Sequence, residues 1–244
     1  MKIYCLTIAA SDTSGGAGIQ RDLKVFNDNG VWGLSVITGI TAQDFDNVFF
    51  ATPLDKNEVE IQLKTIFKNF EISSVKVGVI FNQDIMRLIK NYITKYKTRN
   101  IIIDPIITAS DGSKLLYNSE INYFKAEFLK IADLITPNIP ELMLLSGNQI
   151  QNEDNIISNA KILSVKYDAA IFVKGGHFNT NNRIIKDYLI KNSIIKIFEG
   201  NRHELSQSHG TGCIVSSGIT ANIAKGLSLE NSIVRAKEYF NSIA

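Results

Sequence analysis

The stretch HGTGC, residues 209–213, places a glycine turn and a thiol directly before an amphipathic run. Gly210 and Gly212 flank Thr211, and glycines let backbone N–H groups converge on an anion where a helix begins. Cys213 would lie in the first helical turn, where the helix dipole is expected to lower the thiol pKa below the ~8.5 of a free thiol. A thiolate there could act as a base toward a hydroxyl or as a nucleophile. The alternatives are a plain glycine turn and a buried structural cysteine.

Two acids and a lysine form a second set of candidate groups. Asp104 ends an apolar strand, and because a carboxylate is costly to bury we expect it to be exposed to a cleft. With Glu141 it could hold Mg²⁺, directly or through water, against a nucleotide phosphate, whose charge Lys174 could neutralise. Each acid could instead be a helix cap or turn residue, and the lysine could be solvated. The histidines lack metal spacing, and His177 and His209 are predicted to hydrogen-bond within turns.

Short apolar runs alternate with amphipathic stretches, which indicates a mostly parallel sheet covered by helices on both faces. The predicted strands are 3–9, 34–38, 47–52 at an edge, 74–80, 100–105, 133–136 and 169–174, followed by a hairpin or two late strands in IIKDYLI and SIIKIFE. The predicted helices are 18–30, 57–70, 84–97, 119–131, 140–147, 153–166, 211–225 and 229–242. Residues 106–116 are predicted to form a flexible loop.

Polar and glycine-rich residues follow the carboxyl ends of these strands, where open α/β sheets bind their ligands. The segments concerned are SDTSGGAG (11–18), TGITAQD (38–44), Asp104, TPNIPE (136–141), KGGH (174–177) and HGTGC. The sequence therefore predicts one site at this edge of the sheet.

Length and composition set broad limits. The 244 residues suit one α/β domain spanning 1–244, although two small domains would also fit. A net charge of +2 without blocks of like charge is far from a nucleic-acid-binding pattern. Of the two cysteines, Cys5 is predicted to lie in the core, so no disulfide framework is expected. The N-terminal apolar run is interpreted as a buried strand rather than a signal peptide, and no run approaches a membrane span, which predicts a cytoplasmic protein.

Two common phosphate-binding motifs are absent. The chain contains no G-x-x-x-x-G-K-[ST], and SGGAGIQ departs from G-x-G-x-x-G because Arg21 stands where the third glycine would be. These absences argue against a P-loop protein and a Rossmann oxidoreductase.

The order of several stretches along the chain resembles a known family. They are TIAASDTSGGAGIQRDLKVF, GLSVITGITAQD, VKVGVI, IIIDP, ITPNIPEL, VKGGH and HGTGC. With them the chain resembles the hydroxymethylpyrimidine/phosphomethylpyrimidine kinases of thiamine biosynthesis, which are ribokinase-like. The resemblance implies a three-layer α/β/α sandwich around a mainly parallel central sheet. It implies transfer of the ATP γ-phosphoryl group to 4-amino-5-hydroxymethyl-2-methylpyrimidine, and then to its monophosphate, with ATP and Mg²⁺, in a homodimer.

The resemblance also implies roles for individual residues. By the resemblance, Cys213 would be the catalytic base, and the anion hole would be formed by Gly210, Thr211 and Gly212. The substrate-binding positions are Gln43, Asp22 and Val79, and the nucleotide-binding positions are Lys174 and Thr136. The residues at the positions of the family's magnesium and water network are Asp104, Asn138 and Glu141.

The sequence departs from the family pattern at four positions. Ala10 replaces a glycine, Val79 and Ile107 replace methionines, and Ser110 stands where many members carry lysine. The first three would reshape the pocket, and the last bears on the loop expected to cover the phosphates. Two other functions therefore stay open: a pyridoxal kinase, and a non-catalytic binding module on the same fold.

Overall fold

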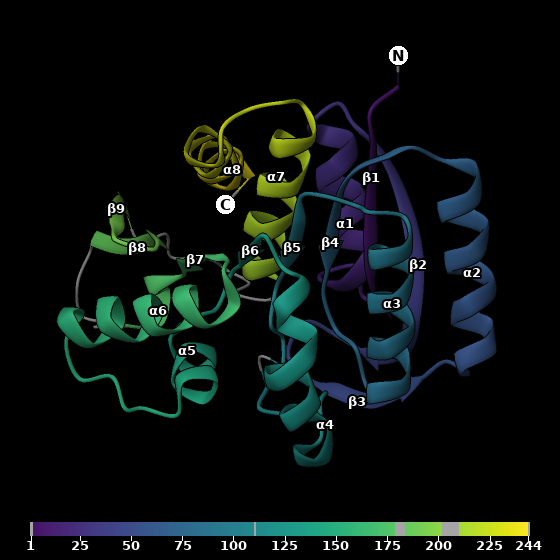
Figure 1. The fold of residues 1–244 in the computed structure, drawn as a ribbon, viewed down its shortest axis with the longest axis horizontal. Coiled ribbons are helices and arrows are strands. Elements are labelled where there is room, and N and C mark those ends of the chain that lie inside the picture. The colour runs from purple at the N-terminus through teal and green to yellow at the C-terminus, as the bar shows by residue number, and fades with distance from the viewer. Residues whose placement is uncertain (1, 110, 179–183, 202–209, 244) are drawn as a thin grey trace.

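The computed structural model describes residues 2–109, 111–178, 184–201 and 210–243. Within these ranges nine strands form one sheet, in the order β3-β2-β1-β4-β5-β6-β7-β8-β9 (Figure 1). The six strands β2-β1-β4-β5-β6-β7 pair in parallel with their neighbours. At the two ends of the sheet, β3 pairs antiparallel with β2, β8 with β7, and β9 with β8. The strands are β1 (Tyr4–Asp12), β2 (Trp32–Gln43), β3 (Val48–Pro53), β4 (Ile72–Val77), β5 (Ile101–Ile103), β6 (Leu134–Ile135), β7 (Ala170–Val173), β8 (Ile184–Lys191) and β9 (Ile194–Asn201).

Helices cover both faces of the sheet, as the alternating pattern predicted (Figure 1). One face carries α1 (Gly18–Asp28), α7 (Thr211–Ala224) and α8 (Leu229–Ile243). The other carries α2 (Lys56–Asn69), α3 (Gln83–Lys95), α4 (Asn118–Tyr123), α5 (Ile139–Ser146) and α6 (Glu153–Tyr167). The apolar faces of the strands and helices form a buried cluster on each side, and Cys5 is fully buried in the core as expected.

Several elements differ from the sequence-based expectation in length. β2 runs well beyond the predicted 34–38 because it pairs with β1 along one edge and with β3 along the other. The predicted helix 119–131 is divided into α4, a π-helical turn (Phe124–Phe128) and a 3-10 turn (Leu129–Ile131). The loop predicted at 106–116 contains a bridge between Thr108 and Lys114, and Leu115 and Leu116 are buried. The described residues on either side of position 110 thus pair with each other, and the end of the segment packs into the core.

The strand order changes direction at β1, which lies between β2 and β4. In open α/β sheets such a switch point opens a crevice beyond the carboxyl ends of the two strands involved. The loop after β1 and the residues after β4 therefore border the expected ligand-binding edge.

No helix in the described ranges has both the length and the apolar character that a membrane crossing requires.

Candidate active site

The loop after β1 is held in shape by one buried carboxylate. Asp12 accepts hydrogen bonds from the backbone N–H of Ser14 at 2.8 Å and of Ala17 at 2.6 Å. Gly18 has a φ of +59°, and a Cβ there would lie 2.4 Å from the carbonyl oxygen of Ala10, so only glycine fits. The loop therefore presents a fixed backbone at the carboxyl end of β1.

The glycine turn before α7 packs directly on this loop. Gly210 has a φ of +75°, and a Cβ at this position would lie 1.9 Å from the carbonyl oxygen of Gly16. The two backbones thus touch, and a glycine is required on both counts. This contact brings the start of α7 to the predicted edge of the sheet. His209, the first residue of the motif, lies outside the described residues.

A lysine–aspartate pair lies beside the same turn. The Nζ atom of Lys174 is 2.7 Å from Oδ1 of Asp104. A Cβ on Gly212 would lie 2.9 Å from that Nζ atom and 3.8 Å from Oδ2 of Asp104. The glycine therefore leaves room for the ammonium group close to the first backbone amides of α7. Together these groups can surround an anion with positive charge and N–H donors.

Asp104 is buried, so the prediction that it is exposed to a cleft is wrong. Its carboxylate also accepts hydrogen bonds from Thr136 Oγ1 at 3.0 Å and from Ser216 Oγ at 3.1 Å. Burial alone would raise the pKa of Asp104, but the neighbouring Lys174 and Lys76 ammonium groups outweigh it and hold the pKa below its usual value. Because Thr136 is itself fully buried, its hydroxyl serves Asp104, and the predicted nucleotide contact is not supported.

Asn138 and Glu141 form a capping box at the start of α5. The Asn138 side chain accepts from the Glu141 N–H at 2.8 Å, and Glu141 Oε2 accepts from the Asn138 N–H at 2.8 Å. The helix-cap alternative therefore describes their geometry. Burial, and then the nearby Asp104 carboxylate, raise the pKa of Glu141 to about 7, against the lowering effect of Lys174.

The predicted magnesium residues offer few open oxygens. Within the described ranges, no group of three His, Cys, Asp or Glu side chains is arranged to hold a metal ion. Both oxygens of Asp104 and one oxygen of Glu141 accept hydrogen bonds from the protein. Mg²⁺ commonly retains several waters and takes its remaining ligands from phosphates and one or two carboxylates. The acids therefore fit an ion held partly through water.

Cys213 lies at the predicted place, but its predicted acidity is wrong. The residue is 5% exposed, and burial raises the pKa of its thiol to about 11. The Lys76 and Lys174 ammonium groups act in the opposite direction without overcoming this desolvation. The sulfur is nevertheless surrounded by charged groups and not by hydrocarbon alone.

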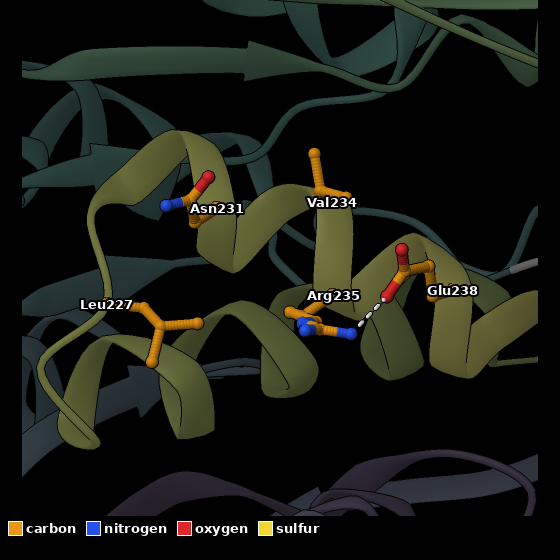
Figure 2. Close-up of a pocket in the computed structure, with 5 residues that line it drawn as sticks. All are labelled: Leu227, Asn231, Val234, Arg235 and Glu238. Carbon is orange, nitrogen blue, oxygen red and sulfur yellow. Dashed lines mark hydrogen bonds and ion pairs between the residues drawn. The ribbon is translucent and has the colours of Figure 1, made fainter.

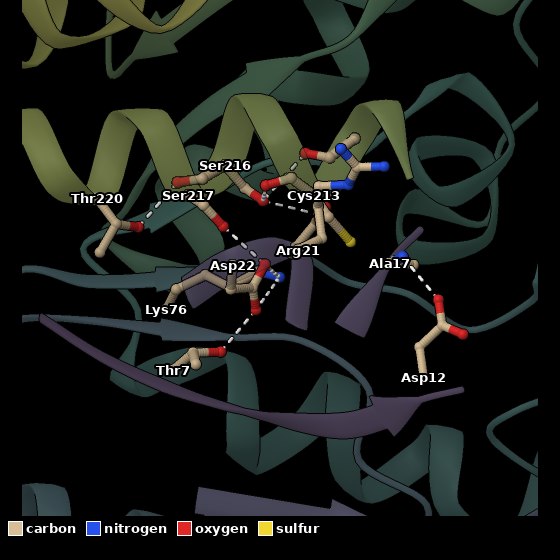
Figure 3. Close-up of polar contacts among 12 residues, drawn as sticks. Thr7, Asp12, Ala17, Arg21, Asp22, Lys76, Cys213, Ser216, Ser217 and Thr220 are labelled. Atoms are coloured by element: carbon tan, nitrogen blue, oxygen red, sulfur yellow. Dashed lines mark hydrogen bonds and ion pairs between the residues drawn. The ribbon is translucent and has the colours of Figure 1, made fainter. Parts of the chain in front are cut away.

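Lys76 is the charged residue that the sequence interpretation missed. It lies in β4 with a fully buried side chain, and its Nζ atom is 2.7 Å from Oδ1 of Asp22 (Figure 3). Asp22 also accepts from Thr7 Oγ1 at 2.6 Å and from Ser217 Oγ at 2.7 Å. The carboxylate is completely buried and engaged within the protein, so the predicted pyrimidine contact by Asp22 is not supported by this geometry. A lysine within the apolar run SVKVGVI was the available signal.

Gln43 and Val79 border the same edge. The backbone N–H and C=O of Gln43 both bond to the Thr13 hydroxyl at 2.9 Å, which ties the end of β2 to the first loop. Val79 is 8% exposed and belongs to a small apolar cluster that also contains Phe81 and Leu115. These residues can form the wall of a pocket for a flat ring. Ser110, at the expected cover of the site, lies outside the described residues.

The surface pocket in Figure 2 begins at the turn after α7, at the end of that helix opposite Cys213. It is lined by Leu227, Asn231, Val234, Arg235 and Glu238. None of the predicted site residues lines it, so the candidate chemistry remains at the carboxyl edge of the sheet.

Comparison with known sequences points to a single family. Residues 12–244 match the profile of the family described as phosphomethylpyrimidine kinase. A hydroxymethylpyrimidine/phosphomethylpyrimidine kinase of Staphylococcus aureus is 35% identical over 237 residues, which cover 97% of this chain and 86% of the relative. The enzyme of the same name from Haemophilus influenzae is 34% identical over 239 residues, covering 97% and 89%.

Comparison with solved structures agrees on the fold and adds a second activity. A phosphomethylpyrimidine kinase from Clostridium difficile 630 superposes with a TM-score of 0.87 at 32% identity, covering 99% of both chains. A Bacillus subtilis pyridoxal kinase in an ADP complex gives 0.89 at 30% identity, covering 98% of this chain and 90% of the other. The S. aureus pyridoxal kinase in complex with AMP-PCP gives 0.90 at 25% identity, covering 99% and 88%. The two pyridoxal kinases were solved with an adenine nucleotide or its analogue bound, and all three share the ribokinase-like sandwich.

Proposed function

The chain belongs to the phosphomethylpyrimidine kinase family and is an ATP-dependent phosphotransferase of thiamine biosynthesis, and on this premise we propose its substrates. The first is 4-amino-5-hydroxymethyl-2-methylpyrimidine, whose hydroxymethyl group receives the γ-phosphoryl group of ATP. The second is the resulting monophosphate, which becomes the pyrophosphate. A non-catalytic binding module is disfavoured, because the relatives are kinases over nearly the whole chain.

One observation carries this proposal: the glycine turn rests on the loop after β1 and leaves Lys174 beside its amides. The contact of Gly210 with Gly16 sets the turn at the strand ends, and Gly212 leaves room for the ammonium group. Phosphoryl transfer depends mainly on positioning and on neutralising charge at the migrating group. The first amides of α7 and Lys174 supply both requirements at one place.

Cys213 is proposed to accept the proton of the attacking hydroxyl. A thiol with a pKa of about 11 is mostly protonated at neutral pH, so only a small fraction acts as thiolate in the resting enzyme. A loose transition state demands little proton transfer before the phosphoryl group has begun to move, and this limits the cost of a weakly populated base. The lysines at 76 and 174 favour the thiolate as it forms.

Mg²⁺ is proposed to arrive with ATP, held by Asp104 and Glu141, partly through water, with Asn138 ordering Glu141. The ion would neutralise phosphate charge when bound. The chain itself contributes the two carboxylates and the capping box that fixes one of them. Gln43 and Val79 are proposed to contact the pyrimidine. A homodimer and a cytoplasmic location remain predictions.

The substrate proposal is tested with purified protein, ATP, Mg²⁺ and a panel of aromatic alcohols, with the products resolved by mass. We expect one phosphoryl group, and then two, on the aminopyrimidine. Absence of both products, with turnover of another alcohol, would contradict the proposal.

Pyridoxal kinase activity is the second candidate, and the likeness to the B. subtilis pyridoxal kinase favours it. Pyridoxal also carries a hydroxymethyl group on a flat nitrogen ring, which the apolar cluster around Val79 could accommodate. Parallel kinetics decide between the two. We expect a higher kcat/KM for the aminopyrimidine, and a preference for pyridoxal would reverse the ranking.

A further inference from the structure

Two consecutive serines of α7 reach two different buried carboxylates. Ser216 Oγ donates to Asp104 at 3.1 Å. Ser217 Oγ donates to Asp22 at 2.7 Å (Figure 3). Each carboxylate also pairs with a lysine, Lys174 in the first case and Lys76 in the second. The first pair belongs to the proposed phosphate site, whereas the second has no role in the proposed chemistry.

The second pair is completely withdrawn from solvent. The side chains of Lys76 and Asp22 are both 0% exposed, and Ser217 is fully buried as well. Desolvating two charges is costly, and well-packed apolar residues often replace a buried ion pair without loss of stability. Overall stability therefore does not require charged residues here. A buried charge pair beside a reactive centre is instead a candidate for a functional role.

The geometry of α7 indicates what that role is. Cys213 and Ser217 are one helical turn apart and lie on the same face of the helix. The bond from Ser217 to Asp22 therefore ties this face of α7 to α1, and the contacts of Asp22 with Lys76 in β4 and Thr7 in β1 connect it to the sheet. The N-cap residue is Gly210, which has no side chain with which to hold the first turn.

The adjoining side of α7 packs closely against α8. A Cβ on Gly218 would lie 2.9 Å from Cβ of Ala236 in α8, so the two helices are already in close contact. Because Ser217 is bonded to α1 and Gly218 is packed against α8, these turns of α7 have little room to shift. A shift of the helix would displace the thiol and the glycine turn together.

We propose that the buried Lys76–Asp22 pair is a positioning device, which through Ser217 holds Cys213 and the glycine turn in register with the sheet edge. Lys76 contacts both carboxylate oxygens of Asp22 and orients them, and the carboxylate accepts the hydrogen bond of the serine hydroxyl. The effect on turnover rests on the proposed kinase reaction, but the effect on the position of α7 does not.

The first test is Ser217→Ala, which removes the bond from α7 and leaves the ion pair in place. We expect kcat to fall about tenfold, because a misplaced anion hole stabilises the transition state less well. KM for the alcohol and for ATP should change less than twofold. The matched control is Ser164→Ala in α6, which removes another fully buried hydroxyl, one that donates to the Ala169 carbonyl oxygen at 2.8 Å. We expect its kcat to stay within twofold of wild type.

A second variant separates positioning from folding. The double change Lys76→Met with Asp22→Leu replaces the ion pair by apolar side chains of similar size, which should preserve the fold. We expect a cooperative melting transition and a loss of kcat at least as large as that of Ser217→Ala. Wild-type kcat in both variants would overturn the proposal. So would an unchanged kcat with a raised KM for the alcohol, because that pattern marks direct substrate contact by Asp22.

A third measurement needs no turnover, so a failure of the proposed function can be told from a failure of this inference. Iodoacetamide alkylation of Cys213 and Cys5 is followed by peptide mass. Burial raises the pKa of both thiols to about 11, which makes Cys5 an internal reference. We expect Ser217→Ala to speed alkylation of Cys213 at least fivefold, with Cys5 and the Ser164→Ala protein unchanged. Equal rates at Cys213 in wild type and Ser217→Ala would overturn the positioning role whether or not the chain phosphorylates the pyrimidine.

Discussion

Two lysine–aspartate pairs, Lys174–Asp104 and Lys76–Asp22, lie beside the start of α7 and have the same arrangement of hydrogen-bond partners. In each, the carboxylate accepts from a lysine, from one strand-end or strand threonine and from one α7 serine. They differ in access to solvent: the side chain of Lys174 is 16% exposed, whereas that of Lys76 is 0% exposed.

This difference separates a charge that can meet a ligand from one that cannot. Lys174 lies against Gly212 at the glycine turn, so its ammonium group can approach an incoming phosphate. Lys76 is confined between β4 and α1 and can act only on its protein neighbours. The same arrangement of side chains thus serves binding at the sheet edge and positioning beneath it.

The strongest test of the comparison exchanges each lysine for methionine. Lys174→Met removes a cation from the phosphate site, and we expect kcat to fall about 10³-fold, together with a loss of stability because Asp104 is also buried. Lys76→Met removes the lysine partner of a fully buried carboxylate, which should cost about 3–5 kcal/mol of unfolding free energy. Steady-state kinetics and urea unfolding measure the two effects. A large stability loss in the first variant and none in the second would contradict the comparison.

Cys213 lies between the two pairs, and its removal has the next largest expected effect. Cys213→Ala should lower kcat about 10²-fold or more with little change in KM for the pyrimidine. Because the thiol pKa is raised to about 11, the base form becomes more abundant as pH rises, so wild-type kcat should increase between about pH 7 and 9. The alanine variant should lose that rise. Cys5→Ala is the control, and a flat wild-type profile would remove the thiol from proton transfer.

Glu141 lies near the Lys174–Asp104 pair, and its titration provides a further test of how this pair differs from the buried Lys76–Asp22 pair. Its folded pKa of about 7 lies above its ordinary value of 4.5, so its protonation stabilises the fold at low pH. That contribution is complete below the unfolded pKa and is lost as pH rises through about 7. Relative to Glu141→Gln, which preserves the capping box, wild type should lose about 2 kcal/mol of unfolding free energy between about pH 5 and 7. Urea unfolding at both values measures this, and parallel pH profiles would refute it.

The smallest expected effects come from the glycines that cover the two lysine tips. Gly212→Ala would push a methyl group to within 2.9 Å of Lys174 Nζ, and displacement of that flexible tip should lower kcat about tenfold. Gly78→Ala would meet Cβ of Ala9 at 3.0 Å and Lys76 Nζ at 3.3 Å, and the crowding should cost about 1 kcal/mol of stability. Equal effects of both variants on turnover would show that the two lysines do not differ in role.

Local patterns were enough to predict the parallel sheet, the antiparallel edge and the loops that form the site. The periods of apolar residues and the glycines at strand ends are short-range signals, and they place HGTGC and SDTSGGAG at one edge. Element lengths were less predictable, since β2 is extended by pairing with two neighbours.

Burial was the property that sequence reasoning could not supply. The acidity predicted for Cys213 was wrong because desolvation depends on what packs over the sulfur, and Asp104 was expected in the open because its compensating lysine is 70 residues away. The bond between Ser217 and Asp22 spans 195 residues and has no local signature. Lys76 alone left a trace, as a charge within an apolar strand.

The contact between Gly210 and Gly16 joins the first loop of the fold to its seventh helix. A ribosome releases these segments at opposite stages of synthesis, so the nascent chain holds the early half of the site long before the late half exists. The proposed site is therefore incomplete until α7 has been synthesised and has packed against the loop after β1. Phosphoryl transfer from ATP can begin only after that step.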